Sequence, residues 1–492
     1  MPLKGFATFL FATVMAAPAH AQEATDWGAA ARGDIEAAYA LYRDNHPGWE
    51  NPGDPKFRDL LQSARDTALQ RAATVKNETD YIRTLGAFSA VLGDGHARLV
   101  RGNASGAVTP GVVQTWPGFV PAWRGNALLV HSAAPGFPFA PGTRIVRCNG
   151  RPIKAWIRER GLESAMRFAE GGQWWSRTPA MMTGRSDAPP PAEACTFVGS
   201  DGREVEQALQ WQPAPEDLAA RRLAATDGTP GPIGLTEPAP GLFWVSMPSF
   251  SPDATGQAAY EKLFADLAAR QSEMAGARAV VLDLRGNDGG SSAWSEKVAQ
   301  ALWGEEAVER RKFDYFAGVS VWYRASAANT AYVDTWLDLF KDDAEMVAQV
   351  RPVAEAMHKH LAAGEPFHVI RDEADDIARA AAKSPATDFT TPVYVITPGR
   401  CASACLDAVD TFTLFGNTSL VGAPTSGDTV YMEVRSEELP SGKGRIVIPI
   451  KFWHQRPRES GEVYQPRLRV DDLDWSSATF LRAIEKDLGP AG

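Results

Sequence analysis

The stretch ARAVVLDLRGNDGG, residues 277–290, decides the fold class of this 492-residue chain. It begins with an apolar run, which favours a buried strand, and ends in a glycine-rich loop before SSAWSEKVAQALW, a predicted helix. The same order returns where TPVYVITPGR (391–400) precedes ASACLDAVDTFTLF. Because strands that alternate with helices form mostly parallel sheets, we expect an α/β fold.

Other segments extend this predicted α/β part, which we place at residues 226–492. GLFWVSMPSF (241–250) and GRIVIPIKFWH (444–454) are further apolar strands. Residues 326–383 are rich in Ala, Asp, Glu and Lys at helical spacing, so we expect a helical insertion that lies over the sheet edge as a lid.

Two smaller parts precede the α/β part. Residues 22–105 are expected to form a helical domain that ends at the turn LGDGHARL (92–99). Residues 106–225 are rich in Gly and Pro and strand-like in pattern. Within them, the Asn-Gly hairpin signal of PGTRIVRCNG (141–150) resembles the second half of a PDZ domain. A generic β-hairpin is the alternative.

The first 21 residues have the pattern of a secretory signal peptide. An early Lys4 precedes an apolar run, and the segment ends Ala19-His20-Ala21, so cleavage is expected before Gln22. A membrane anchor is the alternative, but the apolar run is too short to span a bilayer. We expect an exported protein, periplasmic or secreted, with no membrane insertion after cleavage. The net charge of −10 argues against nucleic acid as a partner.

Export makes disulfides possible for the four cysteines. Three pairings exist, and we expect Cys148–Cys195 with Cys401–Cys405, since each pair falls within one predicted part. Four free thiols are the alternative.

The loops RGNDGG and GRCASAC each follow a predicted buried strand and precede a helix. Ligands of open parallel sheets bind at this edge, and helix N-termini there offer unused N–H groups. Ser403 is the candidate nucleophile, unless its small neighbours only form a packed turn. The N–H groups of Gly289, Gly290 and Ala404 are candidate donors to an oxyanion.

A serine hydroxyl needs a base to accept its proton. His96, in the glycine-rich turn DGHA, is the first candidate, and His454 the second. His358 and His360 fall on different faces of a predicted helix, which argues against a metal pair. We expect no metal or cofactor.

LDLRGNDGG, CASACLDAVDTFTLFGNTSLVGAPTSG and LGDGHARL together resemble the tail-specific (C-terminal-processing) serine peptidases and the related tricorn core protease. The family pattern falls on Asp283, Arg285, Asn287, Gly289, Gly290, Ser403, Ala404, Asp407, Gly422, Thr425 and Gly427. The resemblance implies a ClpP/crotonase-like αβ core with a PDZ-like insert.

One departure from the family pattern concerns the base. Processing peptidases commonly carry a lysine directly after T-x-G, where this chain has Asp428, and the nearest downstream lysines are Lys443 and Lys451. An aspartate cannot act as the neutral amine of a serine–lysine dyad. The resemblance to the tricorn-like branch implies His96 as base instead.

That branch also has a glutamate near the C-terminus that orients the site. Glu459 and Glu462 precede Pro466 and Val470 at irregular spacing. Both remain candidates, and we favour Glu459.

We therefore predict an exported serine peptidase that forms an acyl-enzyme at Ser403, cuts peptide bonds near protein C-termini and binds peptide through its PDZ-like domain by strand addition. The alternative is a non-hydrolytic peptide- or ligand-binding protein on the same fold, for which 15 Trp and 22 Phe would be available. Neither the natural substrate nor the oligomeric state follows from these patterns.

Overall fold

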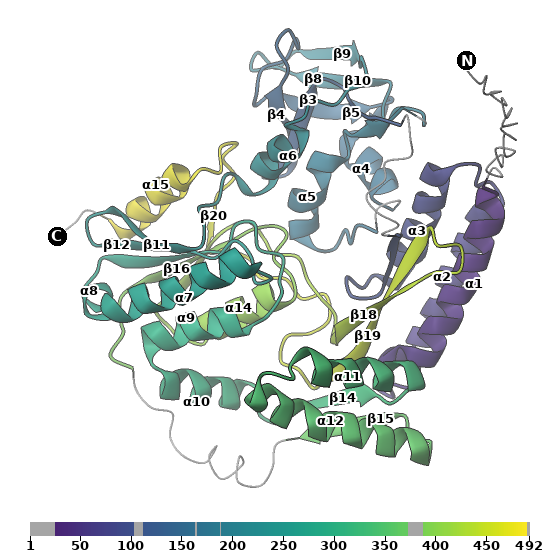
Figure 1. Cartoon of the computed structure of the whole chain (residues 1–492). Helices are drawn as coiled ribbons and strands as arrows, with labels where there is room; N and C mark the ends of the chain where they lie inside the picture. Colours follow the sequence, from purple (N-terminus) through teal and green to yellow (C-terminus); the bar gives the residue numbers. More distant parts are fainter. Residues whose placement is uncertain (1–24, 103–111, 163–164, 187, 372–386, 490–492) are drawn as a thin grey trace, which may run out of the picture.

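The computed structural model describes residues 25–102, 112–162, 165–186, 188–371 and 387–489. The predicted signal peptide and residues 372–386 of the predicted insertion lie outside them. Figure 1 shows a helical part at the right, a β-rich part at the top and an α/β part at the left. None of the described helices is long and apolar enough to cross a membrane.

The six-stranded sheet of the α/β part confirms the predicted fold class. Five of its strands pair in parallel, and β11 adds an antiparallel edge. In spatial order the strands are β11 (Gly234–Ala239), β12 (Leu242–Ser246), β13 (Ala279–Asp283), β16 (Val393–Thr397), β17 (Thr418–Gly422) and β20 (Leu468–Arg469). Every residue of β12, β13 and β16 is buried, as expected for parallel strands covered on both faces.

Alternate side chains of these strands enter two different hydrophobic clusters. Val280 and Leu282 face the cluster that contains the helices α7 (Ala254–Ala269), α9 (Ala293–Trp303) and α14 (Ala404–Thr413). Val281 faces the cluster that contains α15 (Ser477–Leu488) and part of the β-rich domain. Helices therefore cover both faces of the sheet, which fixes its C-terminal edge as the accessible one (Figure 1).

The N-terminal helices pack on a second sheet rather than forming a separate body. This sheet contains β1 (Arg98–Arg101), β14 (Ser320–Arg324), β15 (Phe367–Arg371), β18 (Tyr431–Glu438) and β19 (Gly444–His454). Tyr42 and Phe88 share a hydrophobic cluster with Ile446 and Ile448 of β19. The helices are α1 (Trp27–Asn45), α2 (Phe57–Ala72) and α3 (Glu78–Leu92), with the short η1 (Pro47–Trp49) after α1. Strand β1 thus carries the segment after α3 into the α/β part.

The described part of the insertion predicted at 326–383 contains two helices and a strand. Helices α11 (Ala327–Leu339) and α12 (Ala344–Ala363) are followed by β15, which pairs with β14. Val333 and Met357 of these helices pack with Ile450 of β19. The two helices therefore cover the second sheet, and not the six-stranded sheet as the lid prediction placed them.

The β-rich part is built on an antiparallel sheet. Its strands are β3 (Phe119–Arg124), β4 (Ala127–Ala133), β5 (Arg144–Cys148), β8 (Ala194–Val198) and β9 (Glu204–Ala208), with β6 (Arg151–Pro152) beside β5. Asn149 and Gly150 both have positive φ, 48° and 70°, which confirms the Asn-Gly hairpin. The predicted Cys148–Cys195 disulfide joins paired residues of β5 and β8.

Shorter elements complete the chain. They are β2 (Gln114–Trp116), α4 (Ile153–Leu162), α5 (Gly171–Arg177), η2 (Thr178–Ala180), β7 (Gly184–Arg185), β10 (Gln212–Pro213), α6 (Leu218–Asp227), α8 (Gln271–Ala275) and α10 (Glu305–Tyr315). Helix α5 packs against the loop that leads to Ser403. A Cβ added at Gly172 would lie 2.2 Å from the carbonyl oxygen of Gly399, so only glycine allows this close approach. Backbone contact this close ties α5 to the loop before Ser403.

Candidate active site

Ser403 lies at the corner between β16 and α14, at the C-terminal edge of the six-stranded sheet. Its backbone has φ 54° and ψ −130°, a conformation that a residue with a side chain adopts only when the surrounding structure holds it there. The predicted Cys401–Cys405 disulfide brackets this corner, and both cysteines are buried. A strained backbone held at a helix N-terminus is typical of functional sites.

The glycine-rich loop after β13 packs directly against this corner. A Cβ added at Gly289 would lie 2.9 Å from Ser403 Cβ, and one at Gly290 would lie 2.1 Å from the carbonyl oxygen of Phe250. Both residues also have φ in the region that favours glycine, 117° and 131°. The sequence therefore needs glycine at both positions to bring this loop beside the serine.

Two of the three candidate oxyanion donors have available N–H groups. The N–H of Gly289 donates to Asn287 Oδ1 at 2.9 Å, while Asn287 Nδ2 donates to the carbonyl oxygen of Met247. Within the part of the chain that the structure describes, no acceptor receives the N–H of Gly290 or Ala404. The N–H of Gly289 thus holds the loop in shape, and the donor role stays a prediction for Gly290 and Ala404, whose N–H groups are available.

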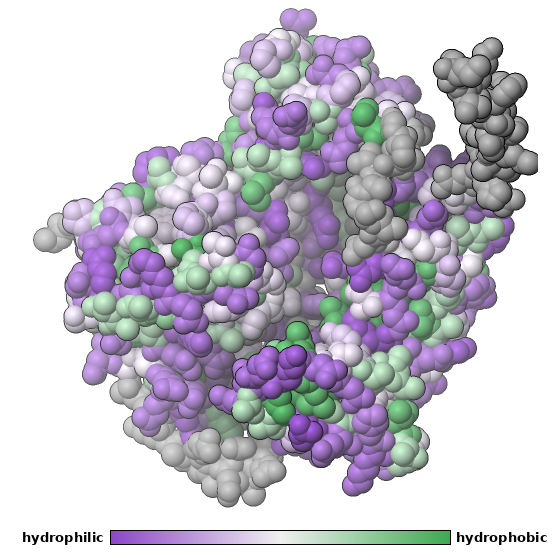
Figure 2. Space-filling model, viewed as in Figure 1, coloured by the Kyte–Doolittle hydropathy of each residue, from purple (hydrophilic) through white to green (hydrophobic). Residues whose placement is uncertain are grey.

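His96 and Ser403 line the same cavity, of about 410 Å³. His96 follows α3, which ends at Gly93 in the left-handed conformation. The backbone N–H of His96 donates to Asp94 Oδ1 at 2.8 Å, and its ring Nδ1 is buried without a hydrogen-bond partner. The surface is hollowed where the three parts of the molecule meet (Figure 2). The structure thus brings the candidate nucleophile and the candidate base, from distant segments, to one cavity.

Two buried carboxylates lie near His96. Asp94 Oδ1 is 3.9 Å from His96 Nδ1, and burial raises the pKa of Asp94 although His96 lowers it. Asp428 lines the cavity and interacts electrostatically with His96. Burial also raises the pKa of Asp428, against the opposing effect of Arg458. Asp428 Oδ2 is buried without a hydrogen-bond partner.

An ion-pair network holds Asp428 in place. Arg458 donates to Asp428 Oδ1, to Asp410 at 3.0 Å and to Asp407 at 2.9 Å. The guanidinium of Arg458 is 1% exposed, so the network is anchored in the core. Where the processing peptidases carry a lysine, this chain has an aspartate fixed by an arginine. Neither Lys443 nor Lys451 lines the cavity.

The two glutamates expected to orient the site do not reach it. Glu459 and Glu462 are exposed, and neither lines the cavity. The carboxylate of Glu462 instead accepts the backbone N–H of Glu459 at 2.9 Å. The turn that carries them faces solvent, so the orienting role stays a prediction for both. Asp94 and Asp428, which lie near His96, stand in the sequence motifs DGHA and TSGD.

The other candidate histidines lie outside the cavity. His454 pairs with Ser320 in the second sheet. His358 contacts Asp334 at 2.9 Å and His360 contacts Glu365, both on the surface of α12. Among the described residues, no group of three His, Cys, Asp or Glu side chains is placed to hold a metal ion.

A buried ion pair at the rim of the site gives a pH prediction. Arg400 lines the cavity, and its Nε lies 2.6 Å from the buried Asp227. Burial raises the pKa of Asp227 from 3.8 to about 6, although Arg400 lowers it. A carboxyl with a raised folded-state pKa contributes stability below its unfolded pKa and loses it as pH rises through the folded value.

We therefore expect the free energy of unfolding of the wild type to fall, relative to Asp227→Asn, by on the order of 3 kcal/mol as pH rises from below 4 to above 6. The ion pair with Arg400 exists only while Asp227 is ionised, and the pKa of about 6 already includes its effect. Urea unfolding of both proteins across this pH range measures the difference. Parallel plots of unfolding free energy against pH for the two proteins would contradict the prediction.

Comparison with known proteins shows what the segment around this site is similar to. Residues 243–454 match the model of peptidase family S41. No curated protein matches the chain. Among solved structures, mature CPAF complexed with lactacystin superposes with a TM-score of 0.59 at 12% identity, covering 93% of this chain and 98% of that one. Mature CPAF alone gives 0.59 at 11% identity, covering 93% and 97%.

These likenesses show that the fold extends over nearly the whole chain, including the parts outside the matched segment. The matched segment contains both the glycine-rich loop and Ser403. The segment that carries both features is thus similar to the serine peptidases of family S41.

Proposed function

We propose that the chain hydrolyses peptide bonds through an acyl-enzyme at Ser403, with His96 as general base. The observation that carries the proposal is the shared cavity: Ser403, on its strained corner, and His96 both line it. Two N–H groups are available beside them, that of Gly290 in the glycine-rich loop and that of Ala404 after the serine. Nucleophile, base and oxyanion donors are the parts that acyl transfer needs.

The reaction would proceed in two halves. His96 accepts the proton of Ser403 as the hydroxyl oxygen attacks the peptide carbonyl, and the N–H groups of Gly290 and Ala404 stabilise the oxyanion. His96 then gives the proton to the leaving amine, which departs with the C-terminal fragment. In the second half, His96 activates a water that attacks the ester and restores the serine.

Asp428 and Asp94 take the orienting role that the sequence assigned to a glutamate. Asp94 fixes the turn by accepting the His96 backbone N–H. Asp428 is held by Arg458 and places its second oxygen in the cavity wall without a partner. Negative charge beside an imidazole favours the imidazolium that forms during catalysis.

Replacement of Asp428 by asparagine tests this positioning role. We expect Asp428→Asn to lower kcat about tenfold or more, since one pKa unit of lost charge stabilisation corresponds to 1.36 kcal/mol. We also expect the acid limb of the pH–rate profile to move to lower pH, because the base loses a neighbouring negative charge. Asp410→Asn is the matched control, because Asp410 shares Arg458 but does not line the cavity. If the acid limb of the pH–rate profile moves equally in both variants, Asp428 acts only through the ion-pair network around Arg458.

Export and C-terminal specificity are part of the proposal. The signal-peptide pattern at residues 1–21 and the two disulfides support an oxidising, extracytoplasmic location. The β-rich domain would hold the substrate by strand addition at an edge of its sheet.

A fluorophosphonate probe separates the peptidase from a binding protein on the same fold. The probe reacts with activated serines, so we expect a single adduct on the peptide that contains Ser403, found by mass spectrometry after proteolysis. Absence of an adduct on the intact protein would favour the alternative function, a binding protein. An adduct on another serine would assign the nucleophile to that serine instead of Ser403.

A further inference from the structure

Ser403 has a backbone conformation that the hydrogen bonds around it do not explain. Its φ of 54° is uncommon for a residue other than glycine. Its side chain makes no capping hydrogen bond to α14. Within the part of the chain that the structure describes, the N–H groups of Ala402, Ser403 and Ala404 find no acceptor. Another restraint must therefore keep the serine in this conformation.

The hydrogen bonds that are present start the helix after the serine. The carbonyl oxygen of Ser403 accepts the N–H groups of Leu406 and Asp407 at 2.8 and 3.2 Å, which closes the first turn of α14. N-cap residues usually make such bonds from extended backbone with negative φ. These bonds are thus as compatible with a relaxed serine as with the observed one.

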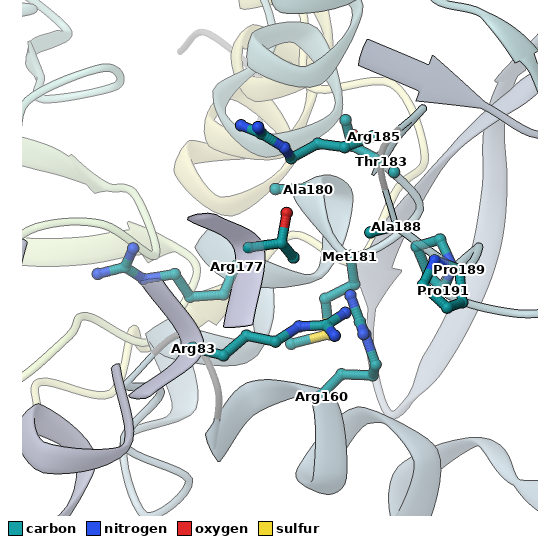
Figure 3. A pocket seen from close by; sticks show the side chains of 12 residues that line it. Arg83, Arg160, Arg177, Ala180, Met181, Thr183, Arg185, Ala188, Pro189 and Pro191 are labelled. Carbon is teal, nitrogen blue, oxygen red and sulfur yellow. The ribbon is translucent and has the colours of Figure 1, made fainter. Parts of the chain in front are cut away.

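Packing holds the corner only in part. The glycine-rich loop approaches so closely that a Cβ added at Gly289 would lie 2.9 Å from Ser403 Cβ. Ser403 also lines the cavity of about 410 Å³, however, and a second cavity of about 260 Å³ shares Arg177 with it (Figure 3). Groups on a cavity wall lack contacts toward the empty side. Packing alone therefore leaves the serine room to relax.

The Cys401–Cys405 disulfide adds a covalent restraint at this corner. Both cysteines are fully buried, in the hydrophobic cluster that contains α9 and α14. Ala402 and Ser403 line the cavity, whereas neither cysteine does. The bond therefore joins the two ends of the corner on its core side and leaves the serine on the side of the cavity.

The short span of this bond indicates a local role. It joins residues four positions apart, whereas Cys148–Cys195 joins residues 47 positions apart. The stabilisation that a disulfide gives to the whole fold grows with the length of the loop it closes. Cys401–Cys405 is therefore the smaller contributor to overall stability, and the part of the chain that it restricts is the corner.

We propose that the Cys401–Cys405 disulfide is a positioning device for Ser403, so that the thiol form of the protein is folded but inactive. Without the bond, the backbone at Ser403 relaxes to negative φ, which turns the hydroxyl group and the N–H of Ala404 away from their places beside the substrate. The consequence for hydrolysis rests on the proposed peptidase function, but the restraint on the corner does not.

Formation of the bond is an oxidation that ties activity to the compartment. The thiols of Cys401 and Cys405 lose two protons and two electrons to a disulfide-containing oxidant, whose own disulfide becomes two thiols. Reducing compartments keep cysteines as thiols, so a chain that has not been exported would carry no active site. Because both cysteines are buried in the folded protein, we expect the bond to form during folding.

Two double variants separate positioning from stability. In Cys401→Ala/Cys405→Ala we expect kcat to fall about 10²-fold, the scale of a misplaced reacting group. KM should stay close to the wild-type value, because the cysteines do not line the cavity. The matched control, Cys148→Ala/Cys195→Ala, should show the larger fall in thermal midpoint and keep kcat near the wild-type value.

Wild-type kcat in Cys401→Ala/Cys405→Ala would overturn the proposal. Equal losses of kcat in the two double variants would also overturn it, because activity would then follow stability rather than the position of Ser403.

A redox comparison tests the same point without a substitution at the corner. Cys148→Ala/Cys195→Ala retains only Cys401 and Cys405, and it is refolded with dithiothreitol or with glutathione disulfide. Alkylation and mass spectrometry count the free thiols, and a fluorophosphonate probe measures the reactivity of Ser403. We expect labelling to be about 10²-fold faster in the disulfide form. Equal labelling of both forms, each folded by circular dichroism, would overturn the proposal.

Amide hydrogen exchange keeps the test independent of catalysis and of any substitution. The wild type is refolded with and without dithiothreitol, and exchange is measured at Leu406 and Asp407, whose N–H groups donate to the Ser403 carbonyl oxygen. We expect exchange at these two amides to be about tenfold faster or more in the thiol form, and exchange in β13 to change less. Unchanged exchange at the corner would overturn the proposal.

The outcomes for the two proposals are distinct. Faster exchange at the corner of the thiol form, in a protein that neither hydrolyses peptides nor reacts with the probe, would reject the proposed function and retain the positioning role. Hydrolysis that depends on Ser403 and is equally fast in both redox forms would retain the function and reject the positioning role.

Discussion

Ser403→Ala is expected to lower kcat/KM for peptide hydrolysis by on the order of 10⁴ to 10⁶, as removal of an activated serine does in other serine hydrolases. Without the hydroxyl, no acyl-enzyme forms, and only the oxyanion donors and substrate binding remain. Because alanine also has a Cβ, the strained backbone at φ 54° changes little, so the thermal midpoint should stay close to that of the wild type.

Ser176→Ala is the matched control for this result. Ser176 lines the same cavity, but its hydroxyl donates to the carbonyl oxygen of Gly172 at 3.0 Å. We expect this variant to retain kcat/KM within about tenfold, since only one hydrogen bond is lost. Equal losses in the two variants would indicate damage to the cavity rather than removal of a nucleophile.

His96→Gln is expected to lower kcat by about 10² to 10⁴, the usual contribution of a positioned general base. Glutamine keeps a polar side chain of similar reach but cannot take a proton. Residues that act as one unit are strongly non-additive. We therefore expect the double variant Ser403→Ala/His96→Gln to be no slower than Ser403→Ala alone.

The second histidine candidate provides the comparison. His454 lies in β19 and does not line the cavity, so His454→Gln should keep kcat near the wild-type value. Loss of activity in His454→Gln with activity retained in His96→Gln would reverse the assignment of the base. Additive losses in the double variant would mean that Ser403 and His96 do not act together.

The fold of the α/β part was predictable because its signals are local. Each of the segments 277–303 and 391–413 contains an uninterrupted apolar strand, a small-residue loop and a helix, and the structure forms all three in both. The lid prediction failed for the opposite reason. Strand β15 is short, and it is stabilised by pairing with β14 across two helices and by packing of Phe367 on Tyr431 and Phe452, so composition alone suggested a helical segment.

In the candidate site, the sequence predicted only those residues that belong to a contiguous motif. Ser403 and the glycine-rich loop lie in contiguous patterns. The role of Asp428 depends on an ion pair with Arg458 that forms only in the folded chain. The use of the Gly289 N–H by Asn287 is likewise a feature of loop conformation.

The central claim is that catalysis passes through an ester on Ser403. Wild-type protein is mixed with a peptide substrate in excess, quenched in acid within one turnover, digested and analysed by mass spectrometry. We predict that the fragment containing Ser403 gains the mass of the N-terminal part of the cleaved peptide, and that His96→Gln accumulates little of this species. Hydrolysis that proceeds with no covalent species on this fragment, or with the acyl group on another residue, would contradict the account.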